Sequence, residues 1–341
     1  MNRRDAEHTG KKKTHHVDEI ARAIDDGSAV IVVGAGVSVM ATLHPDGSIE
    51  SNATWTGLLR HGVEFCEQNV ADLPDGWAKR TLEEIDSGDL GELLAAAEKI
   101  SGKLGCPNGG EYARWLLETV GQLEVTRPNI NKALDNLRDH HGKKIPLITT
   151  NYDTLIEDVT HRKSITWKDR AALDSVFRGD DESIVHIHGV WNRPDTVILG
   201  IRSYEDVIRD THMQAMLRSL PASRVIIFVG FGAGLADPNF GALLKWQANV
   251  FSGSPYHHFR LAKNEEVKNL RKQHPAEQRI VVVDYGEEYD DLEKNCVNSR
   301  KTGRASRTPR MKKLKKSRPP TCRQSRPVSA AERKPKSWSA P

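Results

Sequence analysis

Hydrophobic positions along the chain follow two patterns, one typical of buried strands and one typical of amphipathic helices. Apolar residues recur at helical spacing over Val17–Asp26, and a run of mostly β-branched residues bounded by glycines follows at Ala29–Val33. Such a run predicts a strand buried on both faces, as in a parallel sheet. Further strands are predicted at Ile145–Thr149, Ile184–Ile187, Val197–Leu199, Val225–Val229 and Arg279–Val283.

Helical segments separate these predicted strands, among them Thr154–Val159, Tyr204–Leu217 and Phe240–Asn249. Short apolar strands that alternate with helices predict an α/β fold with a doubly wound, parallel, Rossmann-like sheet. From about residue 54 to residue 141 the pattern is helical almost throughout. We therefore expect an all-helical insertion subdomain in this region, of a size usual for a small subdomain.

Charge is distributed unevenly along the chain. The formal net charge is +4, but residues 294–341 contain 16 Lys and Arg and one acidic residue, so that residues 1–293 carry a net charge of −11. The composition of residues 294–341 predicts a disordered basic tail. A solvated tail without a specific partner is the simpler interpretation, and nucleic acid bound by charge alone stays open. We expect a flexible segment at 1–16 and one domain at 17–293.

Two classes of protein do not fit the sequence. Every apolar run is much shorter than the roughly 20 residues of a membrane helix, and no apolar segment follows the basic N-terminus as in a secretory signal. A cytoplasmic protein without membrane partners is therefore expected. The cysteines form no C-x-x-C pair, so neither structural zinc nor another metal is expected. They are Cys66, Cys106, Cys296 and Cys322.

Two predicted strands end in glycines at the point where a helix would begin. The glycines are Gly34 and Gly36 in the first segment and Gly230, Gly232 and Gly234 in the second. Backbone N–H groups and the positive end of a helix favour a phosphate at such a turn. The first segment has neither the third glycine of G-x-G-x-x-G nor a G-K-[ST] sequence, so a plain tight turn is the alternative interpretation.

Polar residues follow the predicted strand Ile145–Thr149, namely Thr150, Asn151 and Asp153. They would lie at the carboxyl edge of the sheet, where open α/β sheets bind ligands. The alternative is that Asn151 or Asp153 caps the following helix.

Two histidines, His186 and His188, stand at the end of another predicted strand. Two residues apart in a strand, they would point to the same face, as in a metal-binding pair. No third ligand stands out in the sequence. His188, followed by Gly189, suits a general base with space for substrate beside it, whereas His186 is interpreted as a structural histidine.

Taken in order, the segments G-A-G-V-S, T-T-N-Y-D, H-G and G-F-G-A-G-L-A-D-P-N-F resemble the sirtuin-like (SIR2-like) NAD-binding family. The similarity is closest to the prokaryotic branch found in antiphage defence, whose domains hydrolyse NAD. The resemblance spans about residues 17–290 and implies that NAD is the substrate. It also implies that the first loop binds the dinucleotide phosphates through Gly34, Ala35, Gly36 and Ser38.

The resemblance assigns roles to the other segments as well. Thr150, Asn151 and Asp153 would face the nicotinamide and its ribose, and Asn151 and His188 would be catalytic. Gly230 and Gly232 would bind ribose and phosphate. Trp55 corresponds to a tryptophan that follows the first loop in this branch.

One departure from the family bears on function. Protein-deacylating sirtuins carry a zinc module with two C-x-x-C pairs, which this chain lacks. The expected function is therefore hydrolysis of NAD to nicotinamide and ADP-ribose, in antiphage defence by NAD depletion. A non-catalytic NAD or ADP-ribose sensor and an NAD-dependent deacylase are the alternatives. Because constitutive hydrolysis would harm the host cell, a regulatory protein partner or a homo-oligomer is expected.

Overall fold

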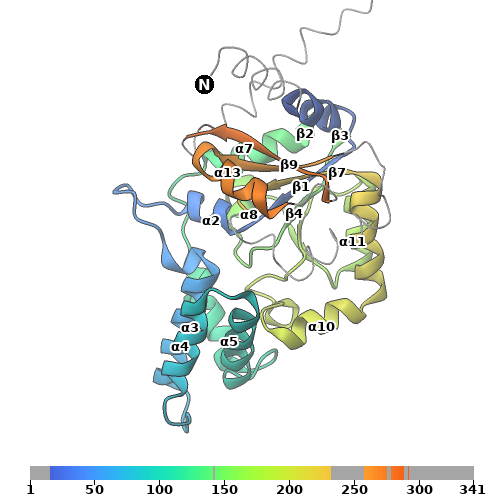
Figure 1. Cartoon of the computed structure of the whole chain (residues 1–341). Coiled ribbons are helices and arrows are strands. Elements are labelled where there is room, and N and C mark those ends of the chain that lie inside the picture. The colour runs from blue at the N-terminus through green and yellow to red at the C-terminus, as the bar shows by residue number, and fades with distance from the viewer. Residues whose placement is uncertain (1–15, 141–142, 232–256, 275–277, 288–290, 292–341) are drawn as a thin grey trace, which may run out of the picture. The chain divides into compact units, whose positions relative to one another are not determined.

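The computed structural model describes residues 16–140, 143–231, 257–274, 278–287 and 291 (Figure 1). The described strands form a parallel seven-stranded sheet in the order β5-β6-β4-β1-β7-β8-β9. Their bounds are β1 Ala29–Val33, β4 Leu147–Thr149, β5 Ser164–Thr166, β6 Ile184–His186, β7 Val225–Val229, β8 His258–Lys263 and β9 Ile280–Gly286. The chain builds one half of the sheet beside β1 and then crosses to the other side with β7. The predicted α/β, doubly wound, Rossmann-like sheet is therefore confirmed.

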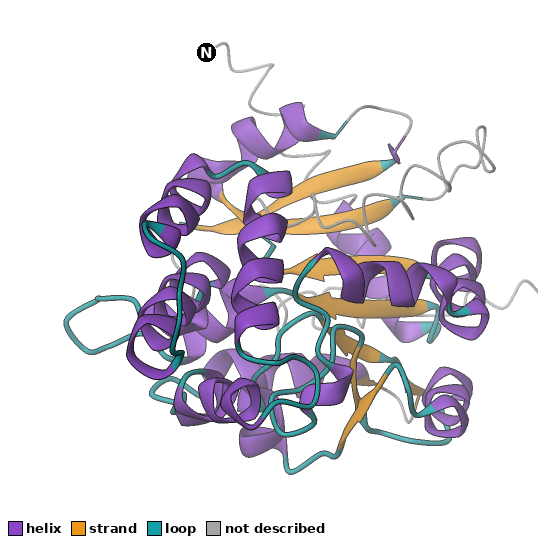
Figure 2. Cartoon of the chain, turned by 90° about the horizontal axis from the view of Figure 1, so that it is seen from below, coloured by secondary structure: helices purple, strands orange, loops and turns teal. Residues whose placement is uncertain are grey.

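Helices cover both faces of this sheet (Figure 2). One core contains Ile31, the helix at 16–25, and the helices α2 Ala35–Ala41, α7 Asn129–Arg138 and α8 Leu155–Thr160. The opposite core contains Val30 and Val32 with α9 Arg170–Arg178, α10 Ile201–Arg209 and α11 Thr211–Ser223. Helix α13, Asn264–Gln273, packs on β8 and β9. Because successive strand residues point to opposite faces, strands with a core on both sides must be apolar throughout.

Four helices form a core of their own beside the sheet, and α3, α4 and α5 lie together in Figure 1. They are α3 Trp55–Asn69, α4 Trp77–Ser87, α5 Leu90–Lys103 and α6 Gly110–Glu118. Trp115, Tyr112 and Leu59 are fully buried between them. Helix α7 also lies within the helical stretch 54–141, but its apolar residues pack into the core of the sheet.

Short elements connect these parts of the chain. They are the 3-10 turns η1 Ser51–Ala53, η2 Val120–Gln122 and η3 Pro194–Thr196, and the two-residue antiparallel strands β2 Asp139–His140 and β3 Lys143–Lys144. None of the helices in the described part of the chain combines the length and the apolar character needed to cross a membrane.

Several predicted elements differ from the structure. The strand predicted at Val197–Leu199 is wrong, because this buried segment pairs with no strand of the described residues and its central amide donates to the carbonyl of His188 instead. The single helix predicted at Tyr204–Leu217 is two helices that meet at Asp210, whose carboxylate caps α11 by accepting from the Met213 amide. Strands β5 and β8 were not predicted. The predicted helix Phe240–Asn249 and the predicted tail at 294–341 lie outside the described residues.

Candidate functional site

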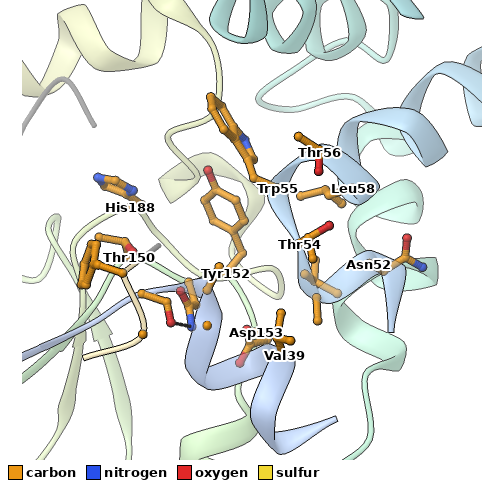
Figure 3. Close-up of a pocket in the computed structure, with 18 of the residues that line it drawn as sticks. Val39, Asn52, Thr54, Trp55, Thr56, Leu58, Thr150, Tyr152, Asp153 and His188 are labelled. Carbon is orange, nitrogen blue, oxygen red and sulfur yellow. Dashed lines mark hydrogen bonds between the residues drawn. The ribbon is translucent and has the colours of Figure 1, made fainter. Parts of the chain in front are cut away.

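The carboxyl ends of β1, β4 and β7 meet where the strand order reverses, because β4 and β7 pair with opposite sides of β1. In open α/β sheets this is the position at which ligands bind. A cavity of about 560 Å³ opens there (Figure 3). Its polar lining comes from the turns after the three strands, from the loop after β6, and from Asn52, Thr54 and Thr56 at the start of the helical region. The predicted site residues among its lining are Gly34, Ala35, Gly36, Thr150, Asn151, Asp153, His188 and Gly230.

The two glycine turns pack directly against each other at this edge. The amide of Gly34 donates to the carbonyl of Val229 at 2.9 Å, and the amide of Gly36 donates to the carbonyl of Gly230 at 2.8 Å. A Cβ on Gly36 would lie 2.7 Å from that oxygen, and Gly230 has a φ of +71°, which favours glycine. The glycines at these positions are therefore needed for close packing of the two turns.

Asn151 is anchored by hydrogen bonds to residues that precede it in the chain. Its side-chain Nδ2 donates to Ser38 Oγ at 2.7 Å and to the carbonyl of Gly34 at 3.2 Å, and its main-chain amide donates to Thr149 Oγ1 at 3.0 Å. The hydroxyl of Ser38 in turn donates to Asp153 Oδ2 at 2.6 Å. Ser38 is buried and does not line the cavity, so it contacts the site through these two side chains.

Asp153 lines the cavity and also caps the helix that follows it. Its Oδ2 accepts from Ser38 beside the cavity, while its Oδ1 accepts from the amide of Leu155 in the first turn of α8 at 3.2 Å. Burial raises the pKa of this carboxyl above its usual value, and the hydrogen bonds from Ser38 and Leu155 oppose the rise. Since both oxygens accept hydrogen bonds, the ionised form fits this geometry.

The two histidines have different surroundings. Strand β6 ends at His186, so the expected strand alternation does not extend to His188. The ring of His188 lines the cavity and packs edge-on against Tyr204 of α10, with 5.6 Å between ring centroids. The ring of His186 is fully buried and contacts Glu157 of α8 and the carbonyl of Asn151. His186 is thus a hydrogen-bonded buried histidine away from the cavity, and His188 is the one that lines it.

The remaining wall of the cavity is largely apolar. In Figure 3, Trp55, Thr54 and Leu58 face the cavity opposite His188 and Thr150, with Tyr152 between the two sides. Further lining residues not predicted from sequence are Leu90, Leu93, Val120 and Tyr204. Their only signal in the sequence is helical spacing, which is the same for core residues.

Two further predictions for this site concern a metal ion and Gly232. Within the described residues, no group of three or more His, Cys, Asp or Glu side chains is placed to hold a metal ion. Gly232, expected beside Gly230, lies outside the described residues.

Comparison with known families gives a match over the second part of the sheet. The matched residues contain β4 to β9 and therefore Asn151, Asp153, His188 and Gly230, whereas β1 and the first glycine turn precede them. SIR2-like domains bind NAD, and the family contains NAD-dependent enzymes. Residues 146–288 of this chain match the SIR2-like domain family.

Proposed function

We propose that this protein is an NAD⁺ glycohydrolase that cleaves the bond between nicotinamide and ribose. The observation that carries the proposal is the convergence of Asn151, Asp153 and His188 on one cavity at the switch point of the sheet. All three belong to the segment that matches the SIR2-like domain family. A cavity with an apolar wall and a few converging polar groups is also typical of sites for small molecules.

The proposed reaction consumes one water molecule. The bond between C1′ of the ribose and the pyridinium nitrogen breaks, and its electron pair stays on the nicotinamide nitrogen. The oxygen of water bonds to C1′, and one proton is released, so that the products are nicotinamide, ADP-ribose and H⁺. As in other glycosidic cleavages, the transition state resembles an oxocarbenium ion, and the site must stabilise positive charge and position water.

The side chains at the cavity suit these tasks. In the described structure Asn151 donates both of its Nδ2 hydrogen bonds to protein atoms, so that its Oδ1 is the group free to orient water or a ribose hydroxyl. His188 would accept the proton from water or ribose, since an imidazole at the cavity can act as a general base. Asp153 has lone pairs left for the amide of nicotinamide and adds negative charge beside the oxocarbenium ion.

The glycine turns would bind the rest of the dinucleotide. Gly34, Ala35 and Gly36 at the start of α2, together with Thr150 and Gly230, bring main-chain groups and one hydroxyl to the same cavity. We assign the phosphates to Gly34, Ala35 and Gly36, with Ser38 buried behind this turn, and we assign ribose and phosphate to Gly230 and to Gly232, which lies outside the described residues. Thr150 would face the nicotinamide and its ribose. The domain at 17–293, with its helical insertion at about 54–141, would then supply the whole site.

The biological role proposed is depletion of cytoplasmic NAD in antiphage defence. This part rests on the ordered motifs described above and their resemblance to the defence branch. Hydrolysis of a shared metabolite has to be restrained before infection, so we propose that a protein partner or self-association controls the activity. Turnover by the purified monomer at full rate would contradict that control.

The test is to incubate the full chain with NAD and to measure nicotinamide and ADP-ribose by liquid chromatography. Asn151→Ala and His188→Ala should each lower turnover by about 100-fold or more while the unfolding transition stays cooperative. The matched controls are Asn192→Ala and His161→Asn. Both residues are exposed, and these substitutions should leave turnover unchanged.

The other outcomes separate the alternatives. Turnover that survives in both site variants would contradict the assignment. Saturable NAD binding by calorimetry without turnover would favour a sensor, and consumption of NAD only in the presence of an acetylated peptide would favour a deacylase.

A further inference from the structure

We propose that Glu157 and His186 form a buried pair that positions Asn151 for the reaction without touching the substrate. This inference rests on the proposed function for its catalytic readout. Neither residue lines the cavity. Both lie directly behind it, on α8 and at the end of β6.

The pair is connected to Asn151 by one hydrogen bond. Nε2 of His186 lies 2.6 Å from Glu157 Oε1, and Nδ1 of His186 lies 3.0 Å from the main-chain oxygen of Asn151. A carbonyl oxygen only accepts hydrogen bonds, so Nδ1 must carry a proton. Glu157 therefore fixes the ring of His186, and the ring fixes the carbonyl of Asn151.

The charge state follows from the surroundings of the ring. Burial disfavours the charged imidazolium, but the Glu157 carboxylate, with smaller contributions from Asn151 and Asp153, raises the pKa of His186 above its usual value. A doubly protonated ring can donate to both of its acceptors at once. Its positive charge is balanced by Glu157 in direct contact and by Asp153 nearby.

Stability alone is a poor explanation for this pair. Buried ion pairs pay for desolvation, and well-packed apolar residues of similar volume are often as stable or more so. Here Glu157 Oε2 is also buried without a hydrogen-bond partner among the described residues, which adds to the desolvation penalty. The arrangement therefore points to a role beyond packing.

Hydrogen bonds at the main chain and at the side chain of Asn151 indicate that the role is to position this residue. Its main-chain oxygen is fixed by His186, its main-chain amide by Thr149, and its Nδ2 by Ser38 and Gly34. These contacts come from three different segments of the chain. Together they leave the Oδ1 of Asn151 with one orientation, which is the orientation that the proposed reaction uses.

The test compares variants that separate folding from positioning. The double variant Glu157→Leu with His186→Leu removes both members of the pair but leaves the carbonyl of Asn151 without its donor. It should therefore stay folded and unfold at a denaturant concentration somewhat below that of the wild type. Its kcat for NAD should fall roughly 100-fold, as expected when a catalytic group is misplaced by about 1 Å, with KM little changed. His186→Asn retains a side-chain N–H donor near the position of Nδ1 and should recover part of kcat.

A merely structural pair would give a different result. Full kcat in a folded double variant would overturn the proposal, and so would equal kcat in His186→Asn and His186→Leu when both fold. If the wild type does not hydrolyse NAD, the proposed function fails, and the positioning of Asn151 is decided by crystal structures. A displaced Asn151 carboxamide in the double variant would support the inference, and an unmoved one would overturn it.

Discussion

The carbonyl oxygen of Gly230 accepts a hydrogen bond from the amide of Gly36 at 2.8 Å, and this bond joins two turns that are far apart in the sequence. Both turns line the candidate site. The position of each depends on the absence of a side chain on the other. The glycines therefore fix the relative position of the ends of β1 and β7 in addition to leaving space for a ligand.

Substitution of Gly36 by alanine should destabilise the protein. The new Cβ would lie 2.7 Å from the oxygen and 2.9 Å from the Cα of Gly230, and neither backbone atom can move without shifting the turn. Overpacking of this kind costs about 1–3 kcal/mol. Denaturant unfolding of Gly36→Ala measures the loss.

Gly102 provides the matched control. A Cβ there meets no atom within 4 Å, and the residue lies in α5. Gly102→Ala should therefore leave stability unchanged or raise it by up to about 1 kcal/mol. Equal stability of the two alanine variants would contradict the close packing of the turns.

Ser38→Ala should lower both stability and turnover. The buried hydroxyl accepts from Asn151 and donates to Asp153, so its removal leaves two buried groups short of a partner. Such a loss costs about 1–3 kcal/mol in the free energy of unfolding. Ser219→Ala, on the exposed surface of α11, should change neither quantity. Wild-type kcat in Ser38→Ala would show that the hydroxyl does not help to place Asn151.

Strands that are buried on both faces can be predicted from the sequence, because all of their residues are apolar. Strands β1 and β7 are apolar throughout because both of their faces are covered. Strand β8 could not be recognised in this way, because the buried Arg260 interrupts its apolar run and instead donates to the carbonyl of Phe231. Conversely, Val197–Leu199 is buried without pairing with a described strand, Val197 and Leu199 in the helical core and Ile198 in a core of the sheet, and burial alone produces the same sequence pattern.

The candidate site likewise contains residues that the sequence identifies and residues that it does not. Asn151, Asp153 and His188 could be identified because polar residues follow apolar strands at the edge where ligands bind. Glu157 could not, since an acidic residue in the first turn of a helix is ordinarily a surface residue that favours the helix dipole. Its contact with His186 depends on the packing of α8 against β6, which no local pattern encodes.

Trp55 allows a test of the apolar wall. Its Nε1 is buried without a hydrogen-bond partner among the described residues, so Trp55→Phe loses no hydrogen bond and should bind NAD nearly as well as the wild type. Trp55→Ala removes the aromatic surface from the cavity and should weaken NAD binding by roughly 10-fold. Calorimetric titration with NAD measures both effects.

Trp167 provides the control, because Trp167→Phe does remove a hydrogen bond: Nε1 of Trp167 donates to the carbonyl of Thr196 at 2.7 Å. Trp167→Phe should reduce the free energy of unfolding by about 1 kcal/mol through the lost hydrogen bond. If Trp55→Phe proved as destabilising as Trp167→Phe, or if Trp55→Ala bound NAD normally, the wall would not have the proposed role.

Acidification should destabilise the protein because the buried ring of His258 resists protonation. His258 is the first residue of β8 and is buried, and its Nδ1 accepts from the amide of Ile226 in β7 at 3.1 Å and must therefore be unprotonated. Burial, together with the neighbouring His257, lowers the pKa of His258 from 6.5 to about 4. Between these two values the unfolded chain binds a proton that the folded protein does not. The contribution to stability is thus fully present above about pH 6.5 and is lost as the pH falls towards 4.

The size of the effect is roughly 3 kcal/mol over that range. Urea unfolding at a series of pH values would measure it, with His258→Asn as the comparison, because an asparagine oxygen near the position of Nδ1 can accept from Ile226 without titrating. The asparagine variant should be less sensitive to pH between 6.5 and 4, whereas His161→Asn, on the exposed surface, should follow the wild type. An unchanged pH dependence in His258→Asn would mean that this ring is protonated in the folded protein and that its bond to Ile226 does not form.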